Sequence, residues 1–359
     1  MPSDQGNGAT RAGTSAYRLS HRDLDQARRA LIGRVHRTPV LRSDQLSARY
    51  GVRLWMKAEN LQPGGSFKLR GALLAVDRLV ARGSRGVLAQ STGNHAIAVA
   101  LAARRHRLPA VLVVPTDTAG VKVRRIRETG AEVVFAGTTL AERVAAVLQL
   151  RDRQGYDVVD PYEDPSVVVG QGTATAELIE QVAAEGGRLD AVVVPIGGGS
   201  AIAGACLAAH PHGVAVVGAE PEAVPAFTAA LRAGEPVSVA SSYTIADGLR
   251  PDRIGDLPFE LAQREVAAVV TVGEPDIADA MCALFLHAGL TVEPAAATAL
   301  AGAAQYGAGR GIDIGVLLSG GNVEPELLAS LLNDTGAAAP ADSPAGYIPW
   351  TDVPWGSHS

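Results

Sequence analysis

The chain has 359 residues, a length that suits two α/β lobes better than one small core. Hydrophobic residues make up 47% of it and charged residues 19%, so a sizeable buried core is expected and extensive disorder is not. The formal net charge is −5 and no basic stripe is present, which excludes nucleic acid as an expected partner.

The expected location follows from what the sequence lacks. Residues 1–16 are polar and contain no apolar stretch of the kind that signal peptides carry. No uninterrupted apolar run reaches membrane-spanning length. The two cysteines, Cys206 and Cys282, fit no metal or redox spacing. We therefore expect a cytoplasmic protein with no membrane partner and with both thiols free.

Short strands and helices alternate along the chain. Ser20 and Asp23 predict a helix start that leads into residues 24–34. Strands are predicted at residues 52–57, 86–90, 110–114, 132–135, 191–195, 214–219 and 314–318. Helices are predicted at residues 67–81, 94–105, 120–129, 139–154, 165–185, 201–209, 275–287 and 294–306. This alternation predicts an α/β fold with parallel sheets flanked by helices, followed by an irregular tail over residues 335–359.

A glycine-rich turn precedes a lysine at the start of the helix predicted from residue 67. Gly64 and Gly65 allow the backbone to turn sharply, and Ser66 is expected to cap the helix. Lys68 then lies in the first turn, where the helix dipole disfavours a cation. A solvated side chain is the ordinary interpretation of a lysine. Burial at this position would instead depress its pKa and suit it to imine chemistry.

Polar groups gather where the strand at 86–90 meets the next helix. The segment consists of Ser91, Thr92, Gly93, Asn94 and His95. Hydroxyls, an amide and free backbone N–H groups at a helix start bind a carboxylate or a phosphate, although an ordinary capped turn has the same composition. For His95, a packed and hydrogen-bonded side chain is the better interpretation than a catalytic base.

Two further glycine turns follow strands. The loop after the strand at 191–195 contains Gly197, Gly198, Gly199 and Ser200. Backbone N–H groups of such a loop at a helix start cradle phosphate, and a flexible loop is the alternative. The second turn, residues 319–322, begins with Ser319 and lies at the carboxyl end of a strand, where ligands bind in α/β sheets.

A dinucleotide site is the competing interpretation of the glycine loop. It requires tight G-x-G-x-x-G spacing and an acidic residue about 20 positions further on. Glu220 nearly fits the acidic position, but the glycines at 197, 199 and 204 do not keep the spacing. An oxidoreductase would also leave Lys68 and Asn94 without a role, so it explains less of the sequence.

Taken together and in this order, the four motifs resemble those of the fold type II pyridoxal-phosphate enzymes, specifically the threonine/serine dehydratases and serine racemase. The resemblance runs from about residue 19 to residue 322, and its most specific part is Ser-Phe-Lys-x-Arg-Gly-Ala combined with Ser-Gly-Gly-Asn. It implies a two-domain fold of the tryptophan synthase β type. We expect a large cofactor-binding domain over residues 1–86 and 160–334 and a smaller mobile domain over residues 87–159.

The resemblance also implies a role for each motif. Lys68 would bind pyridoxal 5′-phosphate as a Schiff base, with Phe67 beside the cofactor ring. Asn94 would contact the pyridine hydroxyl and Ser319 the pyridine nitrogen. The phosphate would lie in the loop of Gly197, Gly198, Gly199 and Ser200. The substrate would meet Ser91, Thr92, Gly93, Asn94 and His95 through its carboxylate and would lie beside Gly248.

The reaction implied by this site is dehydration of a β-hydroxy amino acid such as L-threonine or L-serine to a 2-oxo acid and ammonia. A neutral Ser319 hydroxyl does not hold a proton on the pyridine nitrogen, which favours prompt loss of a β leaving group over transamination. Lys68 would remove the Cα proton. Racemisation requires a second acid or base on the opposite face, for which Thr92 is the candidate. Because threonine is β-branched, its hydroxyl is expected to be turned away, which favours dehydration.

Other activities and sites stay open at this point. Racemisation and β-replacement on a specialised amino acid are the alternative reactions, and a catalytically inactive binding protein is the alternative to an enzyme. Three positions depart from the family pattern. Ile97 stands where Gln is usual, Tyr162 where Asn is frequent and Ser200 where Gly is usual. These departures leave the identity of the substrate undecided. Glu220 fills the first place of a divalent-cation site, but Ala226 stands in the second, so no metal is expected. A homodimer is the expected assembly.

Overall fold

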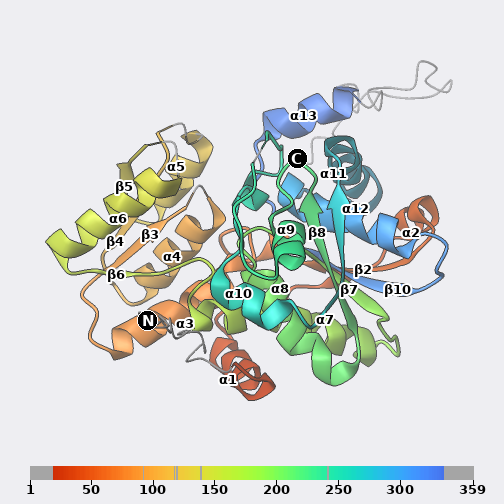
Figure 1. The fold of residues 1–359 in the computed structure, drawn as a ribbon, viewed down its shortest axis with the longest axis horizontal. Helices are drawn as coiled ribbons and strands as arrows, with labels where there is room; N and C mark the ends of the chain where they lie inside the picture. Colours follow the sequence, from red (N-terminus) through yellow and green to blue (C-terminus); the bar gives the residue numbers. More distant parts are fainter. Residues whose placement is uncertain are drawn as a thin grey trace, which may run out of the picture.

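The computed structural model describes residues 19–91, 93–116, 118, 120–137, 140–240 and 242–334, which form two α/β lobes (Figure 1). The larger lobe holds a six-stranded sheet in the order β1 (Val40–Leu41), β2 (Arg53–Ala58), β10 (Asp313–Leu318), β7 (Ala191–Pro195), β8 (Ala215–Pro221) and β9 (Val266–Val272). The smaller lobe holds a four-stranded sheet in the order β5 (Glu132–Phe135), β4 (Ala110–Val114), β3 (Val87–Gln90) and β6 (Asp157–Val158). All neighbouring strands of these sheets are parallel except β1 and β2, which confirms the predicted fold class.

Helices cover both faces of each sheet. Those of the first half of the chain are α1 (His21–Leu31), α2 (Asp44–Tyr50), α3 (Lys68–Ala81), α4 (Asn94–Arg105), α5 (Gly120–Glu128), α6 (Leu140–Gln154) and α7 (Pro165–Ala184). Those of the second half are α8 (Ser200–Ala209), α9 (Ala226–Ala233), α10 (Asp256–Ala262), α11 (Glu274–Ala288), α12 (Pro294–Gly307) and α13 (Pro325–Asp334). Short 3₁₀ turns are η1 (Glu59–Leu61), η2 (His210–His212) and η3 (Asp247–Leu249). None of the helices in the described ranges combines the length and apolar character needed to cross a bilayer.

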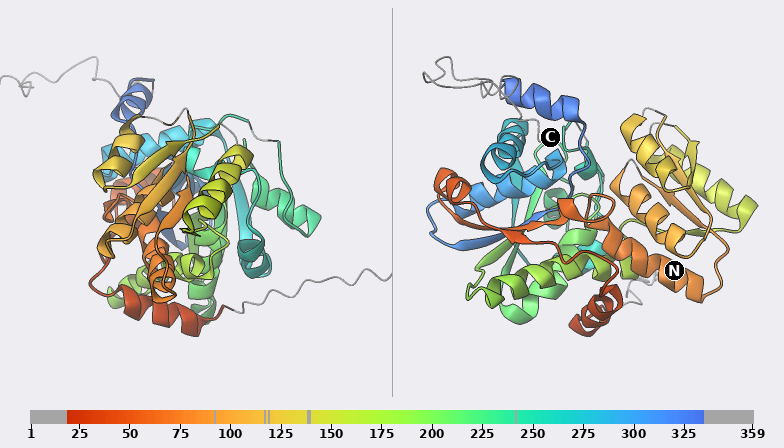
Figure 2. Two further views of the ribbon diagram at one scale, coloured as in Figure 1. Left: turned by 90° about the vertical axis from the view of Figure 1, so that its left-hand side faces the viewer. Right: turned by 180° about the vertical axis from the view of Figure 1, so that it is seen from behind.

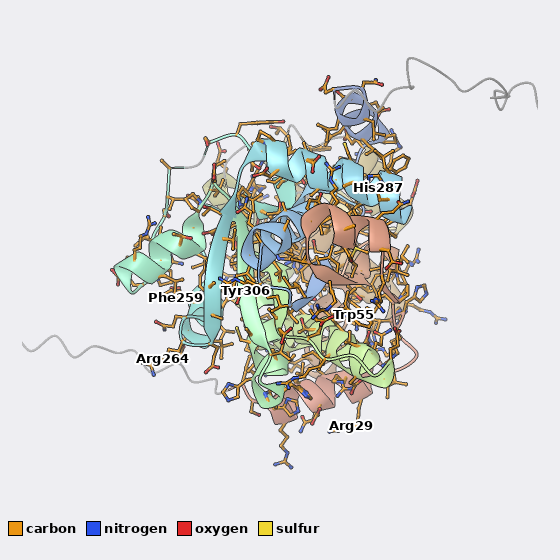
Figure 3. All side chains as sticks on the ribbon, turned by 90° about the vertical axis from the view of Figure 1, so that its right-hand side faces the viewer. Arg29, Trp55, Phe259, Arg264, His287 and Tyr306 are labelled. Carbon is orange, nitrogen blue, oxygen red and sulfur yellow. The ribbon has the colours of Figure 1, made fainter. Side chains whose placement is uncertain are left out.

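The large sheet is buried on both faces, as its continuous apolar strands require. Successive side chains of a strand point to opposite faces, so Leu54 and Met56 enter the core beneath α11 and α12. Trp55, labelled in Figure 3, enters the opposite core with apolar side chains of α7 and α8. On β7, Val193 enters the first of these cores and its neighbour Val194 enters the second.

The small sheet repeats this arrangement, and α3 joins it to the large lobe. One face packs Ala89 and Leu112 against α3 and α4, and the other packs Leu88 and Val113 against Val147 of α6. Helix α3 contacts both α4 and α7, so it lies between the lobes (Figure 2). The first residue of α3 is therefore placed where the two lobes meet.

Two predictions of helix starts have different outcomes. The capping box between Ser20 and Asp23 is present at α1, as predicted. The prediction that Ser66 caps α3 is wrong, because the N-cap is Phe67 and no side chain caps this helix. Ser66 instead forms an isolated β-bridge with Gly320, just beyond the carboxyl end of β10. The tail predicted over residues 335–359 lies outside the described residues.

Candidate active site

Main-chain hydrogen bonds bring the glycine turn before α3 together with the turn after β10. Because β10 runs parallel beside β2, the segments that follow these strands lie next to each other. Phe67 N–H donates to the Ser319 carbonyl at 3.0 Å, and Gly321 N–H donates to the Gly65 carbonyl at 2.9 Å. Gly65 has φ +75°, and a Cβ on it would lie 2.4 Å from Asn322 Oδ1, so this approach requires glycine. The start of α3 is thereby fixed against the large sheet.

The Lys68 amine projects from this turn toward the glycine loop of α8. Nζ lies 3.3 Å from Ser200 Oγ and 3.5 Å from the Pro161 carbonyl oxygen. Burial lowers the pKa of Lys68 from 10.5 to about 8, although the nearby Asp160 and Glu293 carboxylates raise it. About one amine in ten is then neutral at pH 7, which is the nucleophilic form.

Lys57 is the other lysine whose side chain the structure describes, and its amine uses all of its donors in hydrogen bonds. It is 0% exposed and donates to Glu177 Oε2 at 2.8 Å, to Gln181 Oε1 at 2.7 Å and to the Thr38 carbonyl at 2.7 Å. An ammonium has three donors, and all three are used here. Lys68, with only long contacts, is the amine that is free to react.

The depressed pKa makes the reaction of Lys68 with an aldehyde dependent on pH. Only the neutral amine attacks, and its population rises as the pH increases through about 8. We expect the rate at which ligand-free protein takes up pyridoxal phosphate to increase about tenfold from pH 7 to pH 9, as the neutral fraction does. Stopped-flow absorbance measures this rate. A rate that keeps rising steeply beyond pH 9 would show that the amine has an ordinary pKa.

The loop before α8 forms a cradle that only glycines can line. A Cβ on Gly198 would lie 2.1 Å from the Tyr162 ring, and Gly199 has φ +98°. No side chain caps α8, which begins with the buried Ser200, so the amides of its first turn are left for an anion. A phosphate group meets these requirements, as the sequence predicts.

Ser319 and Phe67 complete the surroundings of the amine. Ser319 is 3% exposed and directly follows β10. The Phe67 ring centroid lies 5.2 Å from Lys68 Nζ. The amine, the glycine cradle and the Ser319 hydroxyl match the aldehyde, the phosphate and the ring nitrogen of pyridoxal phosphate. The residues present therefore fit this cofactor.

A chain of amide hydrogen bonds begins at Asn94, the first residue of α4. Asn94 Nδ2 donates to Glu293 Oε1 at 2.7 Å and to Oε2 at 2.9 Å. Asn94 Oδ1 accepts from Asn322 Nδ2 at 2.8 Å. A Cβ on Gly320 would lie 2.4 Å from Glu293 Oε1, so the carboxylate is held against the turn after β10. Glu293 was not predicted as a site residue, although its place directly before a proline at a helix start was a visible signal.

The segment before α4 is placed to receive an anion through its backbone. Ser91 Oγ accepts from Gly93 N–H at 3.3 Å, and Gly93 is the N-cap of α4. The His95 side chain is buried, with Nε2 3.0 Å from the Val159 carbonyl, and burial lowers its pKa to about 3. His95 is thus the packed, hydrogen-bonded histidine that the sequence favours, and its backbone N–H remains for a ligand. Thr92 lies outside the described residues.

The remaining two candidates lie in different parts of the structure: Gly248 lies at the glycine loop, and Glu220 lies at the start of α9. The Gly248 carbonyl would lie 3.0 Å from a Cβ on Gly197, so Gly248 borders the glycine loop. Glu220 is buried and accepts from the N–H groups of Phe227 and Thr228, both at 2.9 Å, at the start of α9. The Glu220 carboxylate therefore already accepts hydrogen bonds from the start of a helix. That the protein requires no divalent cation stays a prediction.

Comparisons with known proteins agree with this site. Residues 32–320 match the family model described as pyridoxal-phosphate dependent enzyme. The chain is 36% identical over 315 residues to the L-threonine ammonia-lyase of Thermotoga maritima, which covers 87% of this chain and 77% of that protein. It is 37% identical over 303 residues to the L-threo-3-hydroxyaspartate ammonia-lyase of Saccharomyces cerevisiae, covering 83% and 92%. The structure of maize serine racemase matches with a TM-score of 0.82 and 32% identity, over 89% of this chain and 99% of that one.

Proposed function

Because the chain belongs to the pyridoxal-phosphate dependent enzymes and has their fold type II architecture, we propose that it is an ammonia-lyase acting on a β-hydroxy amino acid. The products would be a 2-oxo acid and ammonia. The observation that carries the proposal is the buried Lys68 amine, whose Nζ lies 3.3 Å from Ser200 Oγ, where the glycine cradle meets the uncapped start of α8. L-Threonine, L-serine and L-threo-3-hydroxyaspartate are the candidate substrates, since relatives at 36% and 37% identity bear the names of two of them.

Each described residue of the site has a part in this chemistry. When bound, pyridoxal phosphate supplies an aldehyde that condenses with amines and a ring that withdraws electrons from Cα. Lys68 Nζ would bind the aldehyde and, as a free amine, would be the base that accepts the Cα proton. The glycine cradle holds the phosphate. The Ser319 hydroxyl would meet the ring nitrogen without adding negative charge, which would favour departure of the β-hydroxyl.

The substrate is bound where the lobes meet. We propose that the segment Ser91–His95 receives its carboxylate, with the backbone N–H of His95 among the donors, and that Gly248 lies beside the substrate. The four-stranded sheet and its helices would act as the small domain, residues 87–159, over a large domain of residues 1–86 and 160–334. The cytoplasmic location and the homodimer remain predictions. Cys206 and Cys282 are buried and form no disulfide, which is compatible with a reducing compartment.

A substrate panel with chiral analysis tests the proposal and separates the lyase from a racemase. We expect 2-oxo acid formation from at least one β-hydroxy L-amino acid to be faster than formation of its D-enantiomer. Thr92→Ala is expected to spare most 2-oxo acid formation, because elimination needs no acid on the face opposite Lys68, and to remove any racemisation. Thr92→Ser is expected to raise the share of racemisation, since serine is not β-branched. If the wild type converts L-serine to D-serine faster than to pyruvate, racemase replaces lyase as the function.

A further inference from the structure

The two lobes are tied together at the candidate site by a hydrogen bond from Arg125. Arg125 lies on α5 of the small lobe, and its Nη1 donates to Asn322 Oδ1 in the turn after β10. The Arg125 side chain is exposed to solvent and lines a cavity of about 590 Å³. Leu101, Thr129 and Gly64 line the same cavity. Because this cavity separates α5 from the turn, the Arg125 guanidinium is a polar link across an otherwise open gap.

The Arg125 guanidinium extends the chain of amide hydrogen bonds described above beyond Asn322. Asn322 Nδ2 donates to the Gly64 carbonyl at 2.8 Å and to Asn94 Oδ1 at 2.8 Å. Asn94 Nδ2 in turn donates to both oxygens of Glu293. The order Arg125, Asn322, Asn94, Glu293 alternates between the lobes: α5, the turn after β10, the start of α4 and the start of α12. A movement of one lobe against the other therefore changes every bond of the chain.

The chemistry of the two ends fixes the direction of all these bonds. A guanidinium can only donate, and an ionised carboxylate can only accept. Asn322 must therefore turn its oxygen to Arg125 and its NH₂ group to Asn94. Asn94 must then turn its oxygen to Asn322 and its NH₂ group to Glu293. Neither amide can flip while both ends are in place.

We propose that Arg125 is a positioning residue, which through Asn322 holds the Asn94 amide in the orientation that the cofactor ring meets. The inference rests on the proposed function, in which Asn94 contacts the cofactor. It goes beyond that function because it makes the orientation of Asn94 depend on the position of α5. When α5 moves away, Asn322 Oδ1 loses its charged donor and the Asn94 amide is held less firmly.

The experiment compares Arg125→Ala with Arg124→Ala in the purified holoenzyme. Arg124 is the adjacent arginine of α5, is also exposed and has no hydrogen bond to Asn322, so it is a matched control. We expect Arg125→Ala to weaken pyridoxal phosphate binding about fivefold, the size typical of one hydrogen bond, and to shift the absorption band of the bound cofactor. Arg124→Ala is expected to leave both unchanged, and Arg125→Lys is expected to recover part of the affinity because it restores a cationic donor.

Asn322→Ala and the double variant test the route of the effect. If Arg125 acts through Asn322, its replacement should change neither affinity nor spectrum further once Asn322 is alanine. Additive effects of the two replacements, or a wild-type spectrum and affinity in Arg125→Ala, would overturn the proposal. Should Asn322→Ala not fold, the comparison of Arg125→Ala, Arg125→Lys and Arg124→Ala decides the matter alone.

These readouts also separate this inference from the proposed function. Cofactor affinity and absorption are measured without substrate, so they do not depend on which reaction is catalysed. An active ammonia-lyase whose Arg125→Ala form has unchanged affinity and spectrum would retain its function and refute the positioning role. A protein without lyase activity in which Arg125→Ala shifts the spectrum as expected would refute the function alone.

Discussion

Replacement of Lys68 by alanine is expected to reduce turnover by at least about 10³-fold, because the variant lacks both the amine that binds the aldehyde and the base at Cα. Within the described part of the chain, no neighbouring group is placed to substitute for it. The nearest polar contacts of Nζ are a serine hydroxyl and a carbonyl oxygen, and the Lys57 amine is held by three acceptors. Assay of 2-oxo acid release with the best substrate of the panel measures the loss.

A covalent label identifies the lysine directly. The chain contains only three lysines, Lys57, Lys68 and Lys122, so peptide mapping after borohydride reduction has few possible outcomes. We expect the yellow protein to lose its colour on reduction and to carry the pyridoxyl group on Lys68. Lys122→Arg, the control, is expected to keep both the label and the activity. A label on Lys57, or substantial turnover by Lys68→Ala, would refute the assignment.

The position of the reactive lysine was predictable from sequence because its signals are local. A glycine turn, a cation at a helix start and a following apolar helix are adjacent in the chain, and Lys68 does begin α3. The same holds for the glycine loop, where Gly199 adopts the left-handed backbone that favours glycine. The Ser66 cap could not be judged locally, since its backbone is engaged by Gly320, more than two hundred residues away.

The contacts by which distant groups tune the site could not be predicted, because the fold brings separate segments of the chain together. Asp160 and Glu293 raise the pKa of Lys68 against burial, yet they belong to a loop and to a helix start far along the chain. Tyr162 closes the glycine cradle from yet another segment. The contact of Arg125 with Asn322 depends on how the lobes are placed, about which a single sequence carries no local signal.

Secondary structure was missed where elements are short or lie at an edge. Helices α9 and α10 have eight and seven residues, about two turns each, which is too few for a helical repeat to stand out. Strand β9 pairs only with β8, and its side chains are mostly half-buried. Its run of alanine and valine satisfies helix and strand patterns alike, so only the pairing with β8 decides its structure.

A buried cluster of charges behind the active site is expected to be among the most sensitive parts of the fold. Arg70, two residues beyond Lys68, is 0% exposed and donates to both oxygens of Glu59 and both of Glu177, each at 2.8 Å. Lys57 supplies the second cation, through its bond to Glu177. Two cations thus balance two carboxylates, and the cluster ties the first turn of α3 to η1 and α7.

Arg70→Met roughly keeps the volume of this side chain but leaves the buried Glu59 and the largely buried Glu177 facing one lysine. Removal of one partner from a buried ion pair strands the other charge, so we expect the free energy of unfolding to fall by about 3–5 kcal/mol. Urea unfolding followed by circular dichroism measures the change. Arg49→Met removes a surface partner of Asp279 and is expected to change stability little, because both side chains of that pair are well exposed to solvent.

The pH dependence of stability distinguishes a stranded charge from a simple packing defect. In the wild type, burial raises the pKa of Glu177, but the hydrogen bonds and charges of Arg70 and Lys57 outweigh burial and hold that pKa below its ordinary 4.5. Such a depressed pKa contributes stability that is present above pH 4.5 and is lost as the pH falls below it. In Arg70→Met the effect of burial on the pKa of Glu177 is no longer offset by Arg70, so Glu177 is expected to take up a proton more readily. The stability deficit relative to wild type is then expected to shrink in acid. Glu59→Gln and Glu177→Gln, added to Arg70→Met, should recover part of the lost stability at neutral pH. A deficit that is the same at pH 4 and pH 7, with no recovery by the two glutamines, would show that packing rather than charge sets the stability of this cluster.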